Sequence, residues 1–134
     1  MPSRRHAREL ALQALYGAEV GHREPAVMID ETVGRAGNAE TRSFVRDLVL
    51  GTLDHAEESD LVIAPLLEGW TLDRLPTIDR IVLRMSVFEL QHRTETPRPV
   101  VINEAVELAK KFSTEDSGRF INGVLSKAAQ TPGA

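Results

Sequence analysis

The sequence predicts an all-α protein. Apolar residues recur at spacings of three and four along most of the chain, which is the periodicity of helices with one buried face. No run of alternating polar and apolar residues is long enough for a strand. Among 134 residues only four Phe, one Tyr and one Trp are aromatic, so the core must be built from aliphatic side chains, which suit helices. This length favours a single domain spanning residues 1–134.

The first part of the chain predicts three helices. Apolar residues over 7–18 share one helical face, and Gly21 is expected to end that helix. A weaker helix is predicted over about 26–36, ending near Gly37. Asn38 is the expected N-cap of a third helix. The apolar positions of that third helix are Phe44, Val45, Leu48, Val49 and Thr52.

An apolar run over 61–67 follows the polar residues 57–60, and Gly69 is expected to end it. Residues 70–76 predict an irregular turn, because Pro76 disfavours helix at the residue before it. Thr77 is expected to cap the next helix.

The helix after Thr77 has only a thin polar stripe, so it should be the central and most buried helix. Pro97 and Pro99 close the loop that follows it. Two further amphipathic helices are predicted. Their apolar positions are Ile102, Ala105, Val106, Ala109 and Phe112 in the first, and Ile121, Val124, Leu125 and Ala128 in the second.

Charge is unevenly distributed along the chain. The formal net charge is −4, which argues against a generally basic, non-specific nucleic-acid binder. Residues 1–16 nevertheless contain Arg4, Arg5 and Arg8 against Glu9 alone. Cations at a helix N-terminus oppose the helix dipole by roughly 0.3–1 kcal/mol each, so these arginines favour an anionic partner such as a phosphate backbone. The simpler interpretation is a solvated helix end.

Several classes of protein find no support in the sequence. Cysteine is absent, which excludes disulfides and thiolate chemistry, and no segment predicts a membrane span or a signal peptide. We therefore expect a cytoplasmic protein. There is no HExxH, P-loop or GxGxxG motif, so neither an enzyme nor a cofactor is predicted. The four histidines are dispersed without the spacing of a metal site, and the acids within 57–60 are expected to form a solvated face.

Four segments carry a resemblance to a known family. They are RRHARELALQALY at 4–16, FVRDLV at 44–49, DRIVLRMSVFEL at 79–90 and VVINEAVELAKKFSTEDSGRFINGVLSK at 100–127. Together they resemble the NusB family of transcription antitermination and ribosomal-RNA processing factors over nearly the whole chain. The resemblance implies a NusB-like fold of about seven helices in two small packed bundles.

The resemblance also implies an RNA-binding surface. Its candidate residues are Arg4, Arg5, His6, Arg8, Tyr16, Lys111, Phe112, Asp116, Arg119 and Phe120. Each has a simpler structural interpretation, because a Phe at helical spacing is usually core and paired lysines are usually solvated. Ser113 and Asp116 have capping-box-like spacing, so capping alone would explain Asp116. His6 stands where many relatives have an arginine, which predicts weaker RNA binding.

Small and amide residues in the last two helices are expected to have structural roles. Gly118 and Gly123 each cost about 1 kcal/mol relative to Ala in a helix, so close packing is expected at both, with close RNA approach as the alternative near Gly118. Asn103 and Asn122 match asparagines of the family. For Asn103 we expect a buried hydrogen-bonding role.

By resemblance, the chain would bind single-stranded boxA-like RNA of ribosomal-RNA leader transcripts jointly with ribosomal protein NusE. Asp73, Arg74 and Asp79 are the candidate NusE contacts, although Arg74 replaces an acid of the family. The pair would then join other Nus factors on RNA polymerase to suppress premature termination. Family members include monomers and dimers, so homodimerisation stays open.

Two alternatives remain. Similar domains precede the catalytic domain of ribosomal-RNA cytosine-5 methyltransferases, and this chain would be one only as a fragment. A purely protein-binding helical module, with its arginines contacting an acidic partner, is the other alternative.

Overall fold

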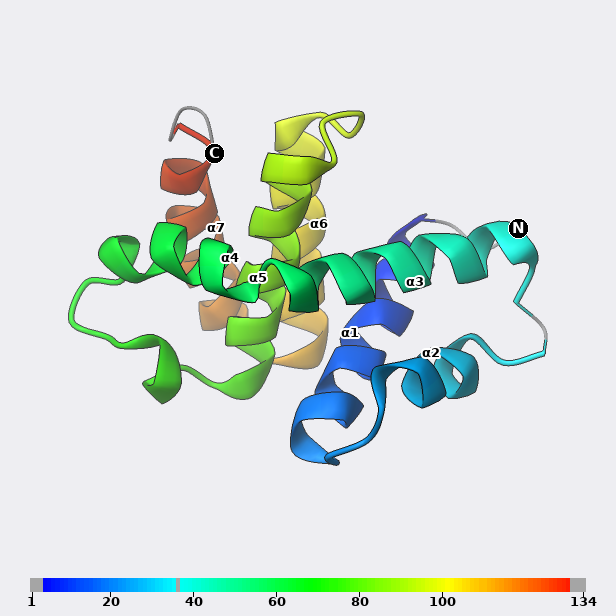
Figure 1. Cartoon of the computed structure of the whole chain (residues 1–134). Helices are drawn as coiled ribbons and strands as arrows, with labels where there is room; N and C mark the ends of the chain where they lie inside the picture. Colours follow the sequence, from blue (N-terminus) through cyan, green and yellow to red (C-terminus); the bar gives the residue numbers. More distant parts are fainter. Residues whose placement is uncertain (1–3, 36, 131–134) are drawn as a thin grey trace. The chain divides into compact units, whose positions relative to one another are not determined.

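The computed structural model describes residues 4–35 and 37–130. In those residues the chain forms seven α-helices and two short 3-10 helices, with no strand, so the predicted all-α class is confirmed (Figure 1). The α-helices are α1 (Arg4–Val20), α2 (Pro25–Val33), α3 (Ala39–Asp54), α4 (Ala56–Ile63), α5 (Thr77–His92), α6 (Arg98–Phe112) and α7 (Glu115–Ala128). The 3-10 helices are η1 (Ala64–Leu66) and η2 (Leu72–Arg74). The chain divides into two compact units, one up to Asp54 and one from His55 onward.

The first unit contains α1, α2 and α3, each packed against the other two. Asn38 caps α3 as predicted, because its Oδ1 accepts a hydrogen bond from the Thr41 N–H at 2.7 Å. The second helix ends earlier than predicted. Its last residue is Val33, because Gly34 takes a left-handed φ of 68° and the chain leaves the helix there.

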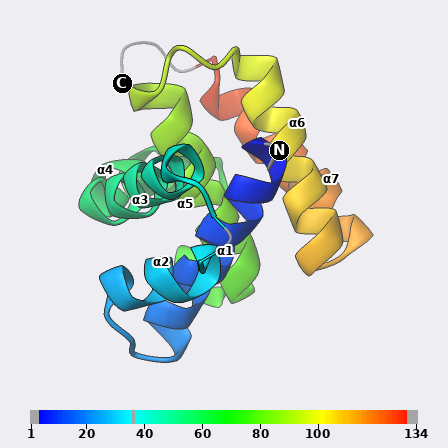
Figure 2. The same ribbon diagram turned by 90° about the vertical axis from the view of Figure 1, so that its right-hand side faces the viewer.

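The second unit is built around α5, which packs against α4, α6 and α7, while α6 and α7 lie side by side (Figures 1 and 2). The prediction that α5 is the most buried helix is confirmed. Its buried residues are Asp79, Ile81, Val82, Leu83, Met85, Ser86, Val87, Phe88, Glu89 and Leu90. This helix therefore contacts each of the other three α-helices of its unit.

Two helix starts differ from the sequence prediction. Thr77 does not cap α5: Pro76 is the N-cap residue, and Thr77 is already the first helical residue. The extended backbone of Pro76, with ψ of 141°, suits a position that leads into a helix. Helix α4 begins at Ala56, so it already includes the polar residues 57–60 that precede the apolar run. The apolar run after them changes to the 3-10 helix η1 at Ala64, because the next residue, Pro65, cannot donate a backbone hydrogen bond.

The helices found in the described residues are too short or too polar to cross a lipid bilayer.

Candidate RNA-binding surfaces and the pocket beside α7

The N-terminal end of α1 presents three exposed basic residues, Arg4, Arg5 and His6. The Arg4 guanidinium lies 4.2 Å from the centroid of the Phe44 ring and 3.4 Å from Glu40 Oε1, both on α3. An exposed cation over an aromatic ring gains roughly 0.5–1 kcal/mol. These contacts with α3 thus offset part of the free-energy cost of placing Arg4 at the positive end of the helix dipole.

Arg8 and Tyr16 occupy different environments on the same helix. Arg8 is only 4% exposed, and its guanidinium lies 5.5 Å from the centroid of the Phe44 ring. Tyr16 is 40% exposed and presents an aromatic surface to solvent. Arg8 is therefore buried within the protein, whereas Tyr16 is open to solvent.

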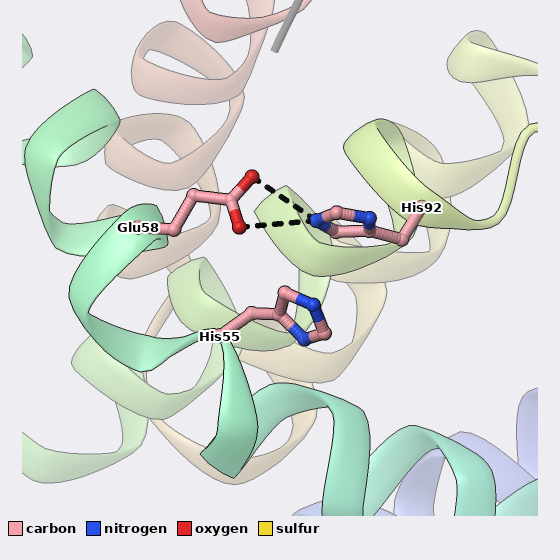
Figure 3. A group of neighbouring side chains, drawn as sticks. All are labelled: His55, Glu58 and His92. Atoms are coloured by element: carbon pink, nitrogen blue, oxygen red, sulfur yellow. Dashed lines mark hydrogen bonds and ion pairs between the residues drawn. The ribbon is translucent and has the colours of Figure 1, made fainter.

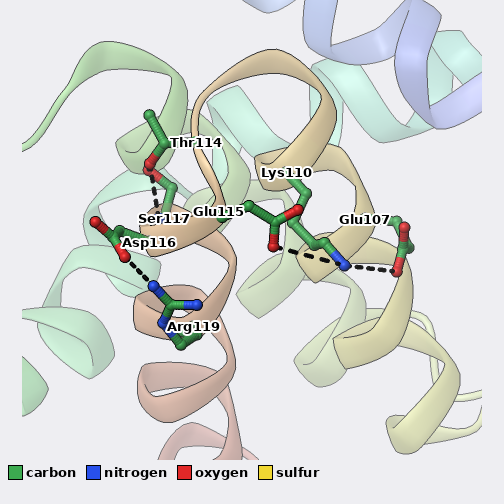
Figure 4. Close-up of polar contacts among 7 residues, drawn as sticks. All are labelled: Glu107, Lys110, Thr114, Glu115, Asp116, Ser117 and Arg119. Carbon is green, nitrogen blue, oxygen red and sulfur yellow. Dashed lines mark hydrogen bonds and ion pairs between the residues drawn. The ribbon is translucent and has the colours of Figure 1, made fainter.

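The turn from α6 into α7 and its flanks carry the second group of candidates, and Figure 4 shows two of them, Asp116 and Arg119. Thr114 is the N-cap of α7, because its Oγ1 accepts a hydrogen bond from the Ser117 N–H at 3.0 Å. The expected Ser113–Asp116 capping pair is wrong, since Ser113 ends α6 one residue too early to cap α7. Asp116 instead lies exposed in the first turn of α7 and forms an ion pair with Arg119.

Acids accompany the basic residues at this turn. The Lys110 ammonium lies 3.9 Å from Glu107 Oε1 and 4.0 Å from Glu115 Oε2 (Figure 4). The Lys111 ammonium lies 5.5 Å from the centroid of the half-buried Phe112 ring. We call Lys111, Phe112, Asp116, Arg119 and Phe120 the α6–α7 surface. Its charge is nearly balanced, in contrast to the arginine-rich end of α1.

The two glycines of α7 have different surroundings. A Cβ on Gly118 would lie 2.6 Å from Lys110 Cγ and 3.6 Å from Val106 Cγ1, so Gly118 permits close packing against α6. A Cβ on Gly123 would meet nothing within 4 Å, so the expected packing role of Gly123 is wrong. The expected buried role of Asn103 is also wrong, because α6 turns that residue toward solvent.

A pocket of about 270 Å³ opens beside α7 in the second unit. It is lined by Trp70, Leu75, Pro76, Asp79, Thr114, Asp116, Ser117 and Phe120. Asp79 is only 4% exposed, and its Oδ2 accepts a hydrogen bond from the Ser117 hydroxyl at 3.0 Å. Its Oδ1 is buried without a hydrogen-bond partner in the described part of the chain. The pocket thus combines apolar walls with a buried carboxylate, one oxygen of which has no hydrogen-bond partner among the described residues.

Trp70 is a functional candidate that sequence reasoning missed. Its side chain is 55% exposed at the pocket rim, which is unusual for a large apolar residue. The sequence predicts an irregular turn at this residue, and its exposure depends on how that turn folds. Asp73 and Arg74, the other candidates of this segment, lie exposed on η2 and do not line the pocket.

Asp73 is held in its charged form by local contacts. The Thr71 hydroxyl donates a hydrogen bond to Asp73 Oδ1 at 2.6 Å, and this bond is the main reason that the pKa of Asp73 is lowered. The backbone N–H of Asp73 and the charges of Arg74 and Arg80 lower the pKa further. Asp73 is therefore a fixed negative charge beside the positive charge of Arg74.

Known proteins match this chain over nearly its full length. The model of the NusB family matches residues 5–130. The transcription antitermination protein NusB of Geobacter sulfurreducens is 44% identical over 133 residues, covering 98% of this chain and 96% of that protein.

Solved structures share the fold. T. maritima NusB has a TM-score of 0.90 at 32% identity, covering 96% of this chain and 91% of that chain. A chain in the crystal structure of antitermination factors NusB and NusE in complex with double-stranded RNA has a TM-score of 0.83 at 32% identity. That match covers 95% of this chain and 96% of the other.

The fold and these likenesses define a small, all-helical transcription antitermination factor that is not an enzyme. The chain belongs to the NusB family.

Proposed function

We propose that this chain binds single-stranded boxA-like RNA of ribosomal-RNA leader transcripts jointly with ribosomal protein NusE. One observation carries the proposal: a relative sharing this fold over 95% of the chain forms a complex with NusE and RNA. That complex contains double-stranded RNA, so the preference for a single strand is part of the proposal. The chain would act over 1–134 as one RNA-binding domain that helps RNA polymerase resist premature termination and supports ribosomal-RNA synthesis and maturation.

The two candidate surfaces would contribute different forces. At the end of α1, exposed Arg4 and Arg5 supply positive charge for phosphates, and His6 offers a ring N–H as a hydrogen-bond donor. On the α6–α7 surface the cations are accompanied by acids, so the contribution there is stacking on Phe112 and Phe120, worth roughly 1–3 kcal/mol per base. Asp116 would accept a hydrogen bond from a base edge, since phosphate would repel a carboxylate. The burial of Arg8 favours a supporting role for it over direct RNA contact.

A fluorescence-anisotropy titration tests the RNA proposal. Labelled boxA-like RNA, its scrambled control and a boxA-like duplex are each titrated with the protein, with and without purified NusE. Preferential binding of single-stranded boxA that strengthens with NusE is the expected result. Equal affinity for all three RNAs would mean that the arginines bind any polyanion, without preference for boxA. No RNA binding in any mixture would favour the purely protein-binding module.

The pocket and η2 form the surface that we propose for NusE, and it adjoins the α6–α7 surface, because Asp116 and Phe120 belong to both. Trp70 is exposed at the pocket rim, with the charged pair Asp73 and Arg74 nearby in sequence. Exposed aromatic residues and arginines are the residue types that most often dominate binding energy at protein interfaces. Asp79 would contribute indirectly, because it is buried and its Oδ2 holds the Ser117 hydroxyl in the wall of the pocket.

A matched pair of variants tests this surface. Trp70→Ala is expected to weaken NusE binding by roughly 2 kcal/mol or more, the scale of an interface hot spot, as measured by isothermal titration calorimetry. Leu61→Ala is the control, because Leu61 is an apolar residue 79% exposed elsewhere in the same unit. If both variants bind NusE as tightly as the wild type, the partner surface is assigned to the wrong place.

The proposal also includes assembly of this chain with other Nus factors and RNA polymerase. Whether the chain is a monomer or a homodimer is a separate question. Two weak surfaces joined in one complex give a combined affinity that neither has alone, which suits an adaptor. Light scattering with and without boxA-like RNA measures the oligomeric state. A homodimer that RNA dissociates would indicate that the dimer buries RNA-binding residues.

A further inference from the structure

Three potential metal ligands converge where α4 begins and α5 ends in the second unit (Figure 3). His55 is the N-cap residue of α4, and Glu58 follows it within the first turn. His92 is the last residue of α5, the helix that packs against α4. We call these three residues the His55 cluster. None of them belongs to the surfaces proposed above for RNA or NusE.

The spacing within the His55 cluster suits a single ion. His92 Nε2 lies 3.0 Å from Glu58 Oε1 and 3.2 Å from Glu58 Oε2. One ligand atom from each residue lies within 4.8 Å of the other two. Two ligands bonded to one zinc ion at about 2.0–2.2 Å in tetrahedral geometry are roughly 3.3 Å apart. Glu58 and His92 already have this separation, and His55 offers a ring nitrogen within 4.8 Å of their ligand atoms.

An aromatic neighbour orients the two imidazoles. Their ring centroids are 4.1 Å apart, and the buried Phe88 ring lies 5.3 Å from His55 and 5.6 Å from His92. Phe88 restricts the positions of both rings, so less side-chain freedom is lost when an ion binds. The side chains of His92 and Glu58 are 33% and 41% exposed, which leaves access from solvent and room for a water ligand.

The donor set selects a class of ion. Two imidazole nitrogens and one carboxylate oxygen are the protein ligands of many zinc sites that keep a fourth position for water. Calcium and magnesium prefer all-oxygen shells and match this set poorly. We propose that His55, Glu58 and His92 bind one zinc-class divalent transition-metal ion. The ion would bind His92 Nε2 in the tautomer that carries its proton on Nδ1, in place of the hydrogen bond to Glu58, and would link the start of α4 to the end of α5.

Calorimetric titration of the metal-free full chain with zinc chloride tests the proposal. We expect one zinc ion per chain, and substitution of cobalt(II) should give the intense visible absorption of a tetrahedral site. His55→Gln and His92→Gln should each weaken zinc binding at least tenfold and abolish the cobalt spectrum. His22→Gln is the matched control, because this exposed histidine lies outside the cluster.

Circular dichroism in the presence of a chelator establishes that each variant is folded before its affinity is compared. Excess zinc should raise the melting temperature of the wild type and of His22→Gln, since an ion that binds only the folded state stabilises it. It should not raise that of a His55→Gln/His92→Gln variant. The proposal is overturned if the wild type binds no zinc, or if the double variant binds it equally well.

Discussion

Thr114 determines where α7 begins, although Ser113 and Asp116 have the more recognisable sequence spacing. Its Oγ1 accepts the hydrogen bond from the Ser117 N–H at 3.0 Å. Sequence reasoning found the cap of α3 at Asn38 but misplaced the caps of α5 and α7. Several hydroxyl or carboxylate residues lie near each of those two helix starts, and the backbone geometry selects among them.

Thr114→Ala should therefore lower the free energy of unfolding by about 0.5–2 kcal/mol, the usual cost of removing an N-cap side chain. Urea denaturation followed by circular dichroism measures the change. Thr114→Ser retains the accepting oxygen and should cost much less. Equal destabilisation in the two variants would mean that the methyl group of Thr114, not its oxygen, stabilises the turn.

Asp73 gives a prediction about pH. Its pKa is lowered chiefly by the Thr71 hydroxyl, so Thr71→Val should raise the pKa of Asp73 toward its ordinary value. Because the folded pKa lies below the unfolded one, the stabilising contribution of Asp73 is present above the unfolded pKa. It is lost as the pH falls through the folded pKa. A carbon-13 NMR titration of the Asp73 carboxyl measures the pKa, and an unchanged value would assign the effect to other groups.

At the scale of elements, periodicity predicted the helices better than their ends. Helix α5 could be recognised from its thin polar stripe, because a helix that is apolar on most sides must be surrounded by others. The end of α2 could not be recognised, because Gly34 and Gly37 are equivalent as stop signals until the backbone of Gly34 is seen to be left-handed.

The glycines of α7 give a matched test of packing between α6 and α7. Gly123→Ala should stabilise the protein by about 1 kcal/mol, because alanine favours a helix and its Cβ meets nothing within 4 Å. Gly118→Ala should raise the free energy of unfolding by less than Gly123→Ala, or lower it, because its Cβ would lie 2.6 Å from Lys110 Cγ. Both changes are measured by urea denaturation.

Lys110→Ala provides the control for this pair, since it removes the Cγ that the new methyl group would meet. In the Lys110→Ala variant, Gly118→Ala should stabilise the protein by about as much as Gly123→Ala does, about 1 kcal/mol. If Gly118→Ala remains costly there, neighbours other than Lys110 limit the approach of the two helices.

At the scale of the whole molecule, the candidate residues fall on both compact units. The arginine-rich end of α1 lies in the first unit, and the α6–α7 surface and the pocket lie in the second. The basic end could be recognised from the sequence, because charge at a helix terminus is a local property. The pocket and the His55 cluster could not, because they join residues distant in sequence: Trp70 with Phe120, and His55 with His92.

The central claim is that the end of α1 supplies the electrostatic attraction for RNA and that the α6–α7 surface supplies base stacking. The salt dependence of boxA affinity tests this claim most directly. Arg4→Gln/Arg5→Gln should make the log-log salt slope shallower by about 1.4, at about 0.7 for each phosphate that is no longer neutralised. Phe120→Leu should weaken binding by roughly 1–3 kcal/mol while leaving the slope unchanged. Arg23→Gln/Arg35→Gln, with the same charge change at exposed positions of the first unit, is the control and should behave like the wild type. Equal slopes for the two double-arginine variants, or a shallower slope for Phe120→Leu, would contradict this division of roles.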